Sequence, residues 1–273
     1  MSTGMFYWFG YKNIDPAERI DLIKTAGFDN VLLWWGDDSF EAEGPRGALA
    51  KRARQAGLFV ENAHMNFDRA NAIWLPDGEA EPVMRDYLRW IAEMGEHEIP
   101  CGVFHVSKGP TPPSPNERGI ERLVQLAEAA EQANMYLALE NLRNPEYLDY
   151  IFDKLPTDRL RFCYDSGHEM CRTNDRVLIE RHASRLMCLH LHDNMGMSAD
   201  QKDEDDMHLP PGEGIIDWPG TMRRLKAAGY TGPVSFECTV EHSERRGGLT
   251  AEAFLREMAV IARELDSILI GAP

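Results

Sequence analysis

The chain has 273 residues, of which 43% are hydrophobic and 27% are charged. This balance is ordinary for a globular protein and excludes a disordered or fibrous chain. Acidic residues outnumber basic ones by 45 to 29, the formal net charge is −16, and no dense Lys/Arg block occurs. Long-range repulsion from a phosphate backbone therefore argues against a nucleic-acid partner. Since no linker or composition shift divides the chain, we predict a single domain over residues 1–273.

The sequence carries no membrane or targeting signal that we recognise. The N-terminal stretch MSTGMFYWFG has no basic region followed by an apolar run, and nowhere do about 18 uninterrupted apolar residues occur. We therefore expect a cytoplasmic protein without a membrane partner. The chain has five cysteines and no CxxC pair: Cys101, Cys163, Cys171, Cys188 and Cys238. Most lie in apolar runs, so we expect reduced, buried side chains rather than metal ligands.

Eight short apolar runs recur along the chain, and each is predicted to form a strand. They are MFYWFGY from Met5, NVLLWW from Asn30, LFVENAH from Leu58, CGVFHV from Cys101, MYLALEN from Met135, LRFCYDSG from Leu160, LMCLHLHDN from Leu186 and PVSFECT from Pro233. Amphipathic segments lie between these runs. In the segment over residues 15–27, Asp15 can cap a helix, Pro16 suits its first position and Gly27 follows its end.

The alternation of strands and helices predicts the overall architecture. It favours parallel strand pairing, and nearly continuous apolar strands indicate burial on both faces. Eight such units in roughly 250 residues predict an α/β fold with a parallel eight-stranded core, a (β/α)8 TIM barrel. An open doubly wound sheet would usually carry a Gly-rich phosphate turn after an early strand, and YWFGYKN contains no GxGxxG.

Polar residues gather at the predicted carboxyl ends of these strands, where a TIM barrel carries its active site. They are His64, His105, Glu140, Asp165, His168, His190, His192, Asp193 and Glu237, and His208 lies in the loop after the seventh strand. Carboxylates after three strands and a histidine after another make a mixed oxygen and nitrogen ligand set. Such a set suits Mn²⁺, Mg²⁺, Co²⁺ or Zn²⁺ rather than a soft thiolate site, so we expect a divalent metal ion.

Each of these residues also has a purely structural interpretation. Asp165 could cap the following helix, and for Asp165 or His190 alone both interpretations stay open. Glu140 and Glu237 follow mostly apolar strand residues, and burying a carboxylate without a partner is costly, so together they require a cation. In LHLHDN, strand alternation sends His190 and His192 to one side. We predict His190 as a metal ligand, with His192 and Asp193 orienting it or the substrate.

Five motifs occur in strand order over most of the chain: ALEN, YDSGH, HLHDN, MHLPPGEGIIDW and SFE. Through them the chain resembles the xylose isomerase-like TIM barrel superfamily, which holds the sugar phosphate isomerase/epimerase family and endonuclease IV. The epimerase branch implies one divalent cation held by Glu140, Asp165, His190 and Glu237, with Glu140 and Glu237 also moving the substrate proton. It further implies substrate contacts from Glu146 and His168. An arginine that ketose 3-epimerases carry after the seventh-strand histidine is absent from HLHDNMG.

The resemblance to endonuclease IV extends to His64, His105, Asp206 and His208, which occupy positions that complete a three-zinc pattern in that enzyme. These four residues are therefore expected to bind either the substrate or additional metal. Abasic-site repair requires a basic surface for DNA, whereas this chain is strongly acidic and carries the loop DQKDEDD beside the site. We favour a small-molecule sugar substrate over DNA.

We expect a metal-dependent isomerase or epimerase of a small sugar, ketose or polyol-derived carbonyl compound. Removing a proton next to a carbonyl leaves an enediolate, which a divalent ion stabilises, and two carboxylates on opposite sides let one remove the proton and the other return it. A metal-dependent lyase or dehydratase of the same fold would use the same cation and base. A carbohydrate-binding protein without activity is a further alternative, and family analogy allows a homo-oligomer.

Overall fold

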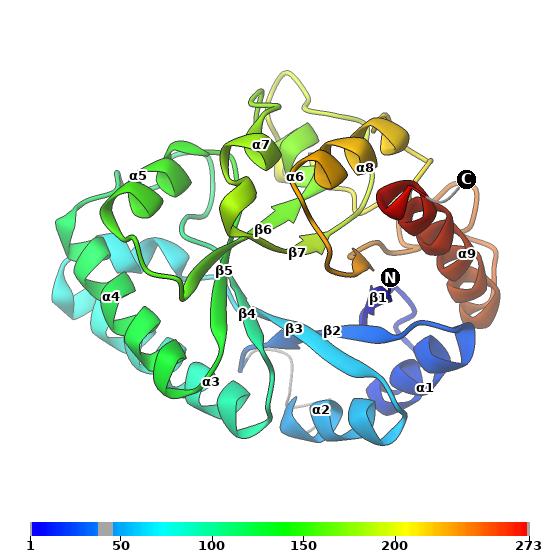
Figure 1. Ribbon diagram of the computed structural model, residues 1–273, viewed down its shortest axis with the longest axis horizontal. Coiled ribbons are helices and arrows are strands. Elements are labelled where there is room, and N and C mark those ends of the chain that lie inside the picture. Colours follow the sequence, from blue (N-terminus) through cyan, green and yellow to red (C-terminus); the bar gives the residue numbers. More distant parts are fainter. Residues whose placement is uncertain (1, 38–45, 272–273) are drawn as a thin grey trace.

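A computed structural model describes residues 2–37 and 46–271, and its centre is a sheet of eight parallel strands (Figure 1). The bounds are β1 Thr3–Phe6, β2 Asn30–Trp35, β3 Phe59–Met65, β4 Cys101–Phe104, β5 Tyr136–Glu140, β6 Leu160–Asp165, β7 Leu186–His190 and β8 Val234–Phe236. In space they follow the order β7-β6-β5-β4-β3-β2-β1-β8. Just past β7, the amide of Leu191 donates to the Ser235 carbonyl at 3.0 Å, and the Glu237 amide donates to the Leu191 carbonyl at 3.0 Å. These bonds close the ring, so the predicted TIM barrel is confirmed.

The helices lie around the outside of the strands (Figure 1). The α-helices are α1 Pro16–Ala26, α2 Arg46–Gln55, α3 Asp77–Glu96, α4 Glu117–Gln132, α5 Glu146–Lys154, α6 Ser166–Cys171, α7 Leu178–Arg181, α8 Trp218–Ala227 and α9 Ala251–Ile270. Three short 3-10 segments add η1 Ala70–Trp74, η2 Ala183–Arg185 and η3 Asp203–Asp205. Within the described ranges, none of the helices combines the length and apolar character that a membrane crossing requires.

The first strand and helix show how local sequence sets the element ends. In α1 the Asp15 carboxylate accepts from the Ala17 amide at 2.9 Å, and Gly27 ends the helix with a φ of 95°, as predicted. The first strand was placed too late in the chain, since β1 begins at Thr3. Its register is set by pairing with both β2 and β8, which starts with Thr3 opposite Val234. Pairing with two neighbours thus outweighs the polar character of Thr3.

The inside of the barrel holds a small apolar cluster made of Cys101, Val103, Ala138, Cys163 and Cys188. All five cysteines are free and buried, as expected from their apolar surroundings. The larger core lies between the strands and the helices, where the other faces of the same strands pack. The cluster therefore fills the barrel on the far side from the strand ends that carry the polar residues.

A register irregularity in β3 gives the barrel interior two polar side chains in succession. Opposite β2, Val31 pairs with Val60 but Leu32 pairs with Asn62, so Glu61 is the extra residue of a β-bulge. Ser235 donates a hydrogen bond to the buried Glu61 carboxylate, and burial raises the pKa of Glu61 to about 7. The bulge therefore lets β3 place Asn62 and His64 toward the site while Glu61 stays below them.

Candidate metal centre

Four buried residues at consecutive strand ends converge on one point, and none of them is more than 9% exposed. Glu140, Asp165 and His190 are the last residues of β5, β6 and β7, and Glu237 directly follows β8. One ligand atom from each lies within 4.8 Å of those from the others. Parallel strands of a closed barrel end on the same rim, which explains how residues far apart in sequence meet here.

His190 lies between two of these carboxylates. Its Nδ1 is 2.5 Å from Oε2 of Glu237 and 3.3 Å from Oε1 of Glu140. Burial alone would lower the pKa of His190, but the two carboxylates outweigh it and hold that pKa well above its ordinary value. Conversely, burial would raise the pKa of Glu237, but the charge of His190 outweighs it and lowers that pKa to about 2.

This donor set fits a divalent cation. Three buried carboxylates surround one imidazole, which leaves negative charge that a buried site needs to neutralise. In addition, Nδ1 of His168 is buried and has no hydrogen-bond partner in the described part of the chain, at 3.6 Å from Oε1 of Glu140 and 3.8 Å from Oδ1 of Asp165. Oxygen ligands with one histidine nitrogen suit a hard or borderline ion such as Mg²⁺, Mn²⁺, Co²⁺ or Zn²⁺.

Asp165 caps a helix and also belongs to the candidate metal centre. One carboxylate oxygen accepts from the His168 amide at 2.6 Å and caps α6, while the other lies 3.1 Å from Nε2 of His192. Ser166 does not take the cap, because its hydroxyl donates to the His192 carbonyl at 2.8 Å. His192 therefore contacts Asp165 rather than His190, which LHLHDN predicted it to orient, while capping fixes the first carboxylate oxygen.

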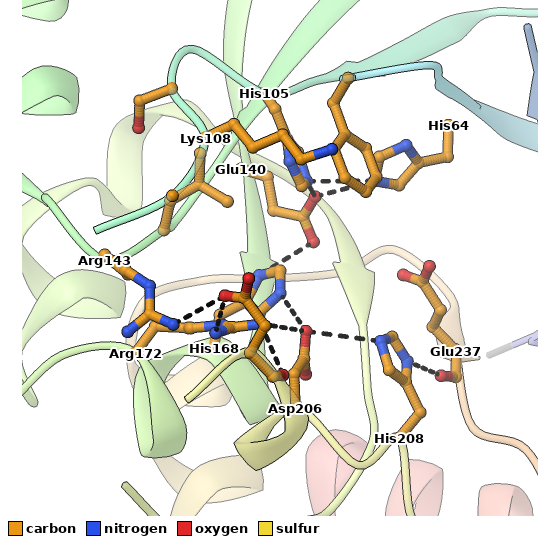
Figure 2. Close-up of a pocket in the computed structure, with 15 residues that line it drawn as sticks. His64, His105, Lys108, Glu140, Arg143, His168, Arg172, Asp206, His208 and Glu237 are labelled. Atoms are coloured by element: carbon orange, nitrogen blue, oxygen red, sulfur yellow. Dashed lines mark hydrogen bonds and ion pairs between the residues drawn. The ribbon is translucent and has the colours of Figure 1, made fainter. Parts of the chain in front are cut away.

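His64 and His105 approach Glu140 from the side of β3 and β4 (Figure 2). Their Nε2 atoms lie 3.1 Å and 2.6 Å from the same Glu140 oxygen, and 3.2 Å from each other. Burial lowers the pKa of His105 to about 4, which favours the neutral imidazole that metals bind. His64, Glu140 and His190 thus form a second group of donors within 4.8 Å, sharing two members with the first.

A third donor group consists of His192, Asp206 and His208. The rings of His192 and His208 stack with centroids 4.0 Å apart, and Oδ2 of Asp206 lies 3.0 Å from Nε2 of His168 and 3.6 Å from Nε2 of His208. His208 has a φ of 48°, a left-handed conformation that is uncommon for a residue with a side chain. Its Nδ1 donates to the Glu237 carbonyl at 2.7 Å, which holds the ring in place.

The donor groups open into a cavity of about 290 Å³ (Figure 2). It is lined by His64, Phe67, His105, Ser107, Lys108, Gly109, Glu140, Leu142, Arg143, His168, Arg172, Asp203, Asp206, His208 and Glu237. Phe67 supplies an aromatic wall and stacks on His105 with ring centroids 4.2 Å apart. The sequence-predicted residues that face the cavity are therefore joined by three basic side chains.

Two predicted site residues lie elsewhere. Glu146 begins α5 with an exposed side chain that accepts from Asn144, and it does not line the cavity. Asp193 turns away from His190 and accepts hydrogen bonds from the amide of Gly212 and the indole of Trp218, both at 2.9 Å. Asp193 thus anchors the glycine-containing loop before α8 rather than His190.

Asn62, which the sequence patterns did not single out, holds His190. Oδ1 of Asn62 lies 3.3 Å from Nε2 of His190, so the ring donates to the amide from the nitrogen remote from the carboxylates. The signal was present in LFVENAH, where Asn62 and His64 are two positions apart on one strand face. Phe67, Arg143 and Arg172 were missed because they lie in loops or past a helix end, where periodicity gives no direction.

Comparisons with known proteins agree with this architecture. The family described as xylose isomerase-like TIM barrel matches residues 20–261. The uncharacterized protein y4fM of Sinorhizobium fredii is 28% identical over 52% of this chain, and the match covers only 44% of that relative. A Streptomyces coelicolor protein named provisionally as a hydroxypyruvate isomerase is 25% identical over 83% of this chain and 86% of its own. The structure of an L-ribulose 3-epimerase aligns with a TM-score of 0.76 at 18% identity, covering 99% of this chain and 96% of that one.

Proposed function

Because the chain belongs to the xylose isomerase-like TIM barrel family, we propose that it is a divalent-metal-dependent isomerase or epimerase of a small polyhydroxy carbonyl compound. One observation carries the proposal. Glu140 and Glu237 approach the ligand His190 from different strands, and both also line the cavity. Two carboxylates that face one substrate position can exchange the roles of base and acid.

In the proposed reaction, the divalent ion, when bound, supplies positive charge against the negative charge that develops on the substrate oxygens. Glu140, Asp165, His190 and Glu237 would hold it. One of the two glutamates removes the proton from the carbon next to the carbonyl. The other returns a proton either to the same carbon or, when the proton of the adjacent hydroxyl moves to the former carbonyl oxygen, to the neighbouring carbon. The first outcome is epimerisation and the second is isomerisation. His168, at the cavity wall, would orient a substrate hydroxyl through its ring nitrogen.

Size and kinship support this class of substrate. A cavity of about 290 Å³ lies at the small end of ligand pockets, which typically enclose about 300–1,000 Å³, so it suits a compound of a few carbons. Two similar proteins, one named provisionally as a hydroxypyruvate isomerase and the other an L-ribulose 3-epimerase, have names of the same reaction class. The absence of an arginine in HLHDNMG argues for a sugar contact pattern different from that of ketose 3-epimerases.

A second candidate is a phosphodiesterase with three metal ions, as in endonuclease IV. It is favoured by the two further donor groups. One contains His64, Glu140 and His190, and the other contains His192, Asp206 and His208. It is opposed by the net charge of −16, which repels a nucleic-acid backbone. We rank it second for that reason.

The test is solvent deuterium exchange, followed by proton NMR, with metal-loaded protein and a panel of ketoses, aldoses and hydroxy-keto acids in D2O. An isomerase or epimerase incorporates deuterium at the carbon next to the carbonyl, whereas a dehydratase releases water and leaves an unsaturated or deoxy product. Glu237→Gln, assayed at a metal concentration that saturates the variant, should lower kcat about 10²–10⁴-fold. A matched control is Glu241→Gln, an exposed glutamate four residues later that pairs with Lys12.

Full activity of metal-loaded Glu237→Gln would contradict the acid/base assignment. Hydrolysis of a phosphodiester without any deuterium exchange would contradict the proposed class and support the second candidate.

A further inference from the structure

One hydroxyl group in the cavity wall makes no hydrogen bond to the protein. Ser107 lies three residues past the end of β4, lines the cavity and is only 3% exposed. Its side chain forms no hydrogen bond within the described part of the chain. A serine hydroxyl can both donate and accept, and burying it without a partner costs free energy. A ligand that supplies the partner is therefore favoured at this position.

The backbone on both sides of Ser107 is anchored to the short segment η1. The side chain of Asn71 donates to the Lys108 carbonyl at 2.9 Å and accepts from the Lys108 amide at 2.8 Å. The indole of Trp74 donates to the Val106 carbonyl at 2.6 Å. The position of the Ser107 side chain is thus set before a ligand binds, which lowers the entropy cost of a contact to it.

The residues before Ser107 show which way its side chain faces. His105 and Ser107 both line the cavity, whereas Val106 between them packs into the larger core and is 1% exposed. This alternation continues the pattern of the strand. Nε2 of His105 already lies 2.6 Å from Glu140. Because Ser107 is two residues farther from the strand end, we expect it to meet a part of the substrate more distant from Glu140.

The neighbouring Lys108 does not provide a free charge at this wall. Its ammonium pairs with Asp68 at 2.5 Å and lies 5.3 Å from the Phe67 ring centroid. Figure 2 shows Lys108 across the cavity from Asp206, so this wall is also remote from the acidic side of the cavity. The polar group that the segment offers to a ligand is therefore the neutral hydroxyl of Ser107.

We propose that Ser107 is a specificity-determining residue whose hydroxyl binds a substrate hydroxyl group beyond the reacting carbons. The inference rests on the proposed function and adds the length of the substrate. In a ketose, the carbonyl carbon and the carbons on either side of it take part in the proton transfer. The hydroxyl group at Ser107 then belongs to the fourth or a later carbon. The substrate class is a ketose of at least four carbons rather than a three-carbon compound.

The test combines one change in the protein with one change in the ligand. Metal-loaded wild type and Ser107→Ala are titrated by calorimetry with L-ribulose and with its 4-deoxy and 5-deoxy analogues. The wild-type protein should bind one of the analogues about fivefold to a hundredfold more weakly than L-ribulose, because that analogue leaves the serine unpaired. Ser107→Ala should weaken L-ribulose binding about threefold to tenfold without raising the Kd of that analogue.

The matched control is Ser114→Ala, which removes the same group from an exposed serine of the same loop, outside the cavity lining. It should bind all three ligands as the wild type does. The assignment is overturned if the wild-type protein does not bind L-ribulose or binds all three ligands equally. Equal weakening of all three ligands by Ser107→Ala would also overturn it, since a purely structural role has that effect.

Deuterium exchange on the same ligands separates this inference from the proposed function. Exchange together with the expected loss of discrimination in Ser107→Ala supports both. Exchange with unchanged discrimination in Ser107→Ala would overturn the role of Ser107 and leave the isomerase or epimerase standing. Discrimination that depends on Ser107, without exchange on any substrate, would support the hydroxyl contact and contradict the proposed reaction.

Discussion

The amide oxygen of Asn62 accepts from Nε2 of His190 at 3.3 Å, and this contact decides which ring nitrogen faces the carboxylates. With the proton on Nε2, Nδ1 is free to bind a cation beside Glu140 and Glu237. Asn62 reaches this position because the β3 bulge at Glu61 shifts the strand by one residue. A strand irregularity thus favours one tautomer of His190, which lies on the opposite side of the barrel.

Replacing Asn62 with alanine should weaken metal binding about 10–100-fold, because the ring of His190 loses the group that fixes its orientation and tautomer. The affinity is measured by competition with a chromogenic chelator. Asn174→Ala, which changes an exposed asparagine before α7, is the control and should bind metal as the wild type does. Unchanged affinity in Asn62→Ala would show that His190 is positioned by its other neighbours.

Metal content distinguishes the two candidate functions. We expect elemental analysis of protein purified without chelator to find about one divalent ion per chain, held by the group with three carboxylates. Asp206→Asn should leave this ion in place, because Asp206 belongs only to the group with His192 and His208. Glu140→Gln should reduce metal content. About three zinc ions per chain would instead favour the phosphodiesterase.

Gly167 is the glycine of YDSGH, and the structure gives it a packing role. A Cβ at this position would overlap the ring of His192. Gly167→Ala should therefore destabilise the protein by about 1–3 kcal/mol and displace His192 from Asp165. Gly78→Ala is the matched control, since a Cβ there meets nothing within 4 Å and Gly78 lies in the first turn of α3. It should be neutral or stabilise by up to about 1 kcal/mol.

Those two variants are compared by urea unfolding. Equal stability of Gly167→Ala and Gly78→Ala would mean that the His192 ring moves aside at no cost.

His182, remote from the cavity, should make stability depend on pH. It lies between the rings of Phe152 and Phe162, and burial lowers the pKa of this histidine to about 4, outweighing the charge of Asp149. The unfolded chain takes up this proton near pH 6.5 and the folded protein only near pH 4, so the contribution is complete above pH 6.5 and is lost as the pH falls to 4. This difference between the pKa values of the folded and unfolded states corresponds to a change of about 3 kcal/mol in the free energy of unfolding.

Urea unfolding between pH 4 and 7 checks this expectation. His182→Leu should have a shallower dependence of the unfolding free energy on pH than the wild type. His242→Leu, a change at an exposed histidine, should retain the wild-type dependence. Identical slopes for His182→Leu and wild type would show that His182 is accessible to protons in the folded protein.

Much of the fold followed from sequence because the strand signal and the helix caps are local. Local residues identify the ends of these elements. The strand β6 ends in the run CYD, and Asp15 and Gly27 cap the two ends of α1. The start of β1 could not be predicted from local sequence, since Thr3 joins the sheet by pairing with Val234, more than two hundred residues away. Closure of the barrel by Leu191 depends on the same kind of distant pairing.

The metal-ligand candidates were predictable for a related reason: strand ends of a barrel share one rim, so Glu140, Asp165, His190 and Glu237 could be placed together from strand order. Loop residues lack such a frame. Arg143 and Arg172 lie together because both contact Asp203. The spacing of these three residues in the sequence does not predict that contact. Glu146, which resemblance assigned to the substrate, lies at an exposed helix start instead.

The segment that carries Asp203 leaves and rejoins the barrel through a single antiparallel bridge. The amide of Asp193 donates to the Leu209 carbonyl at 2.7 Å, and the Leu209 amide returns a bond at 2.8 Å. His208 adjoins this bridge, whereas Asp203 lies well inside the loop. Insertions or exchanges around residues 196–203 therefore leave the stacked histidines where they are. The cavity wall that Asp203 provides can therefore vary with this loop while the donor atoms beneath it stay in place.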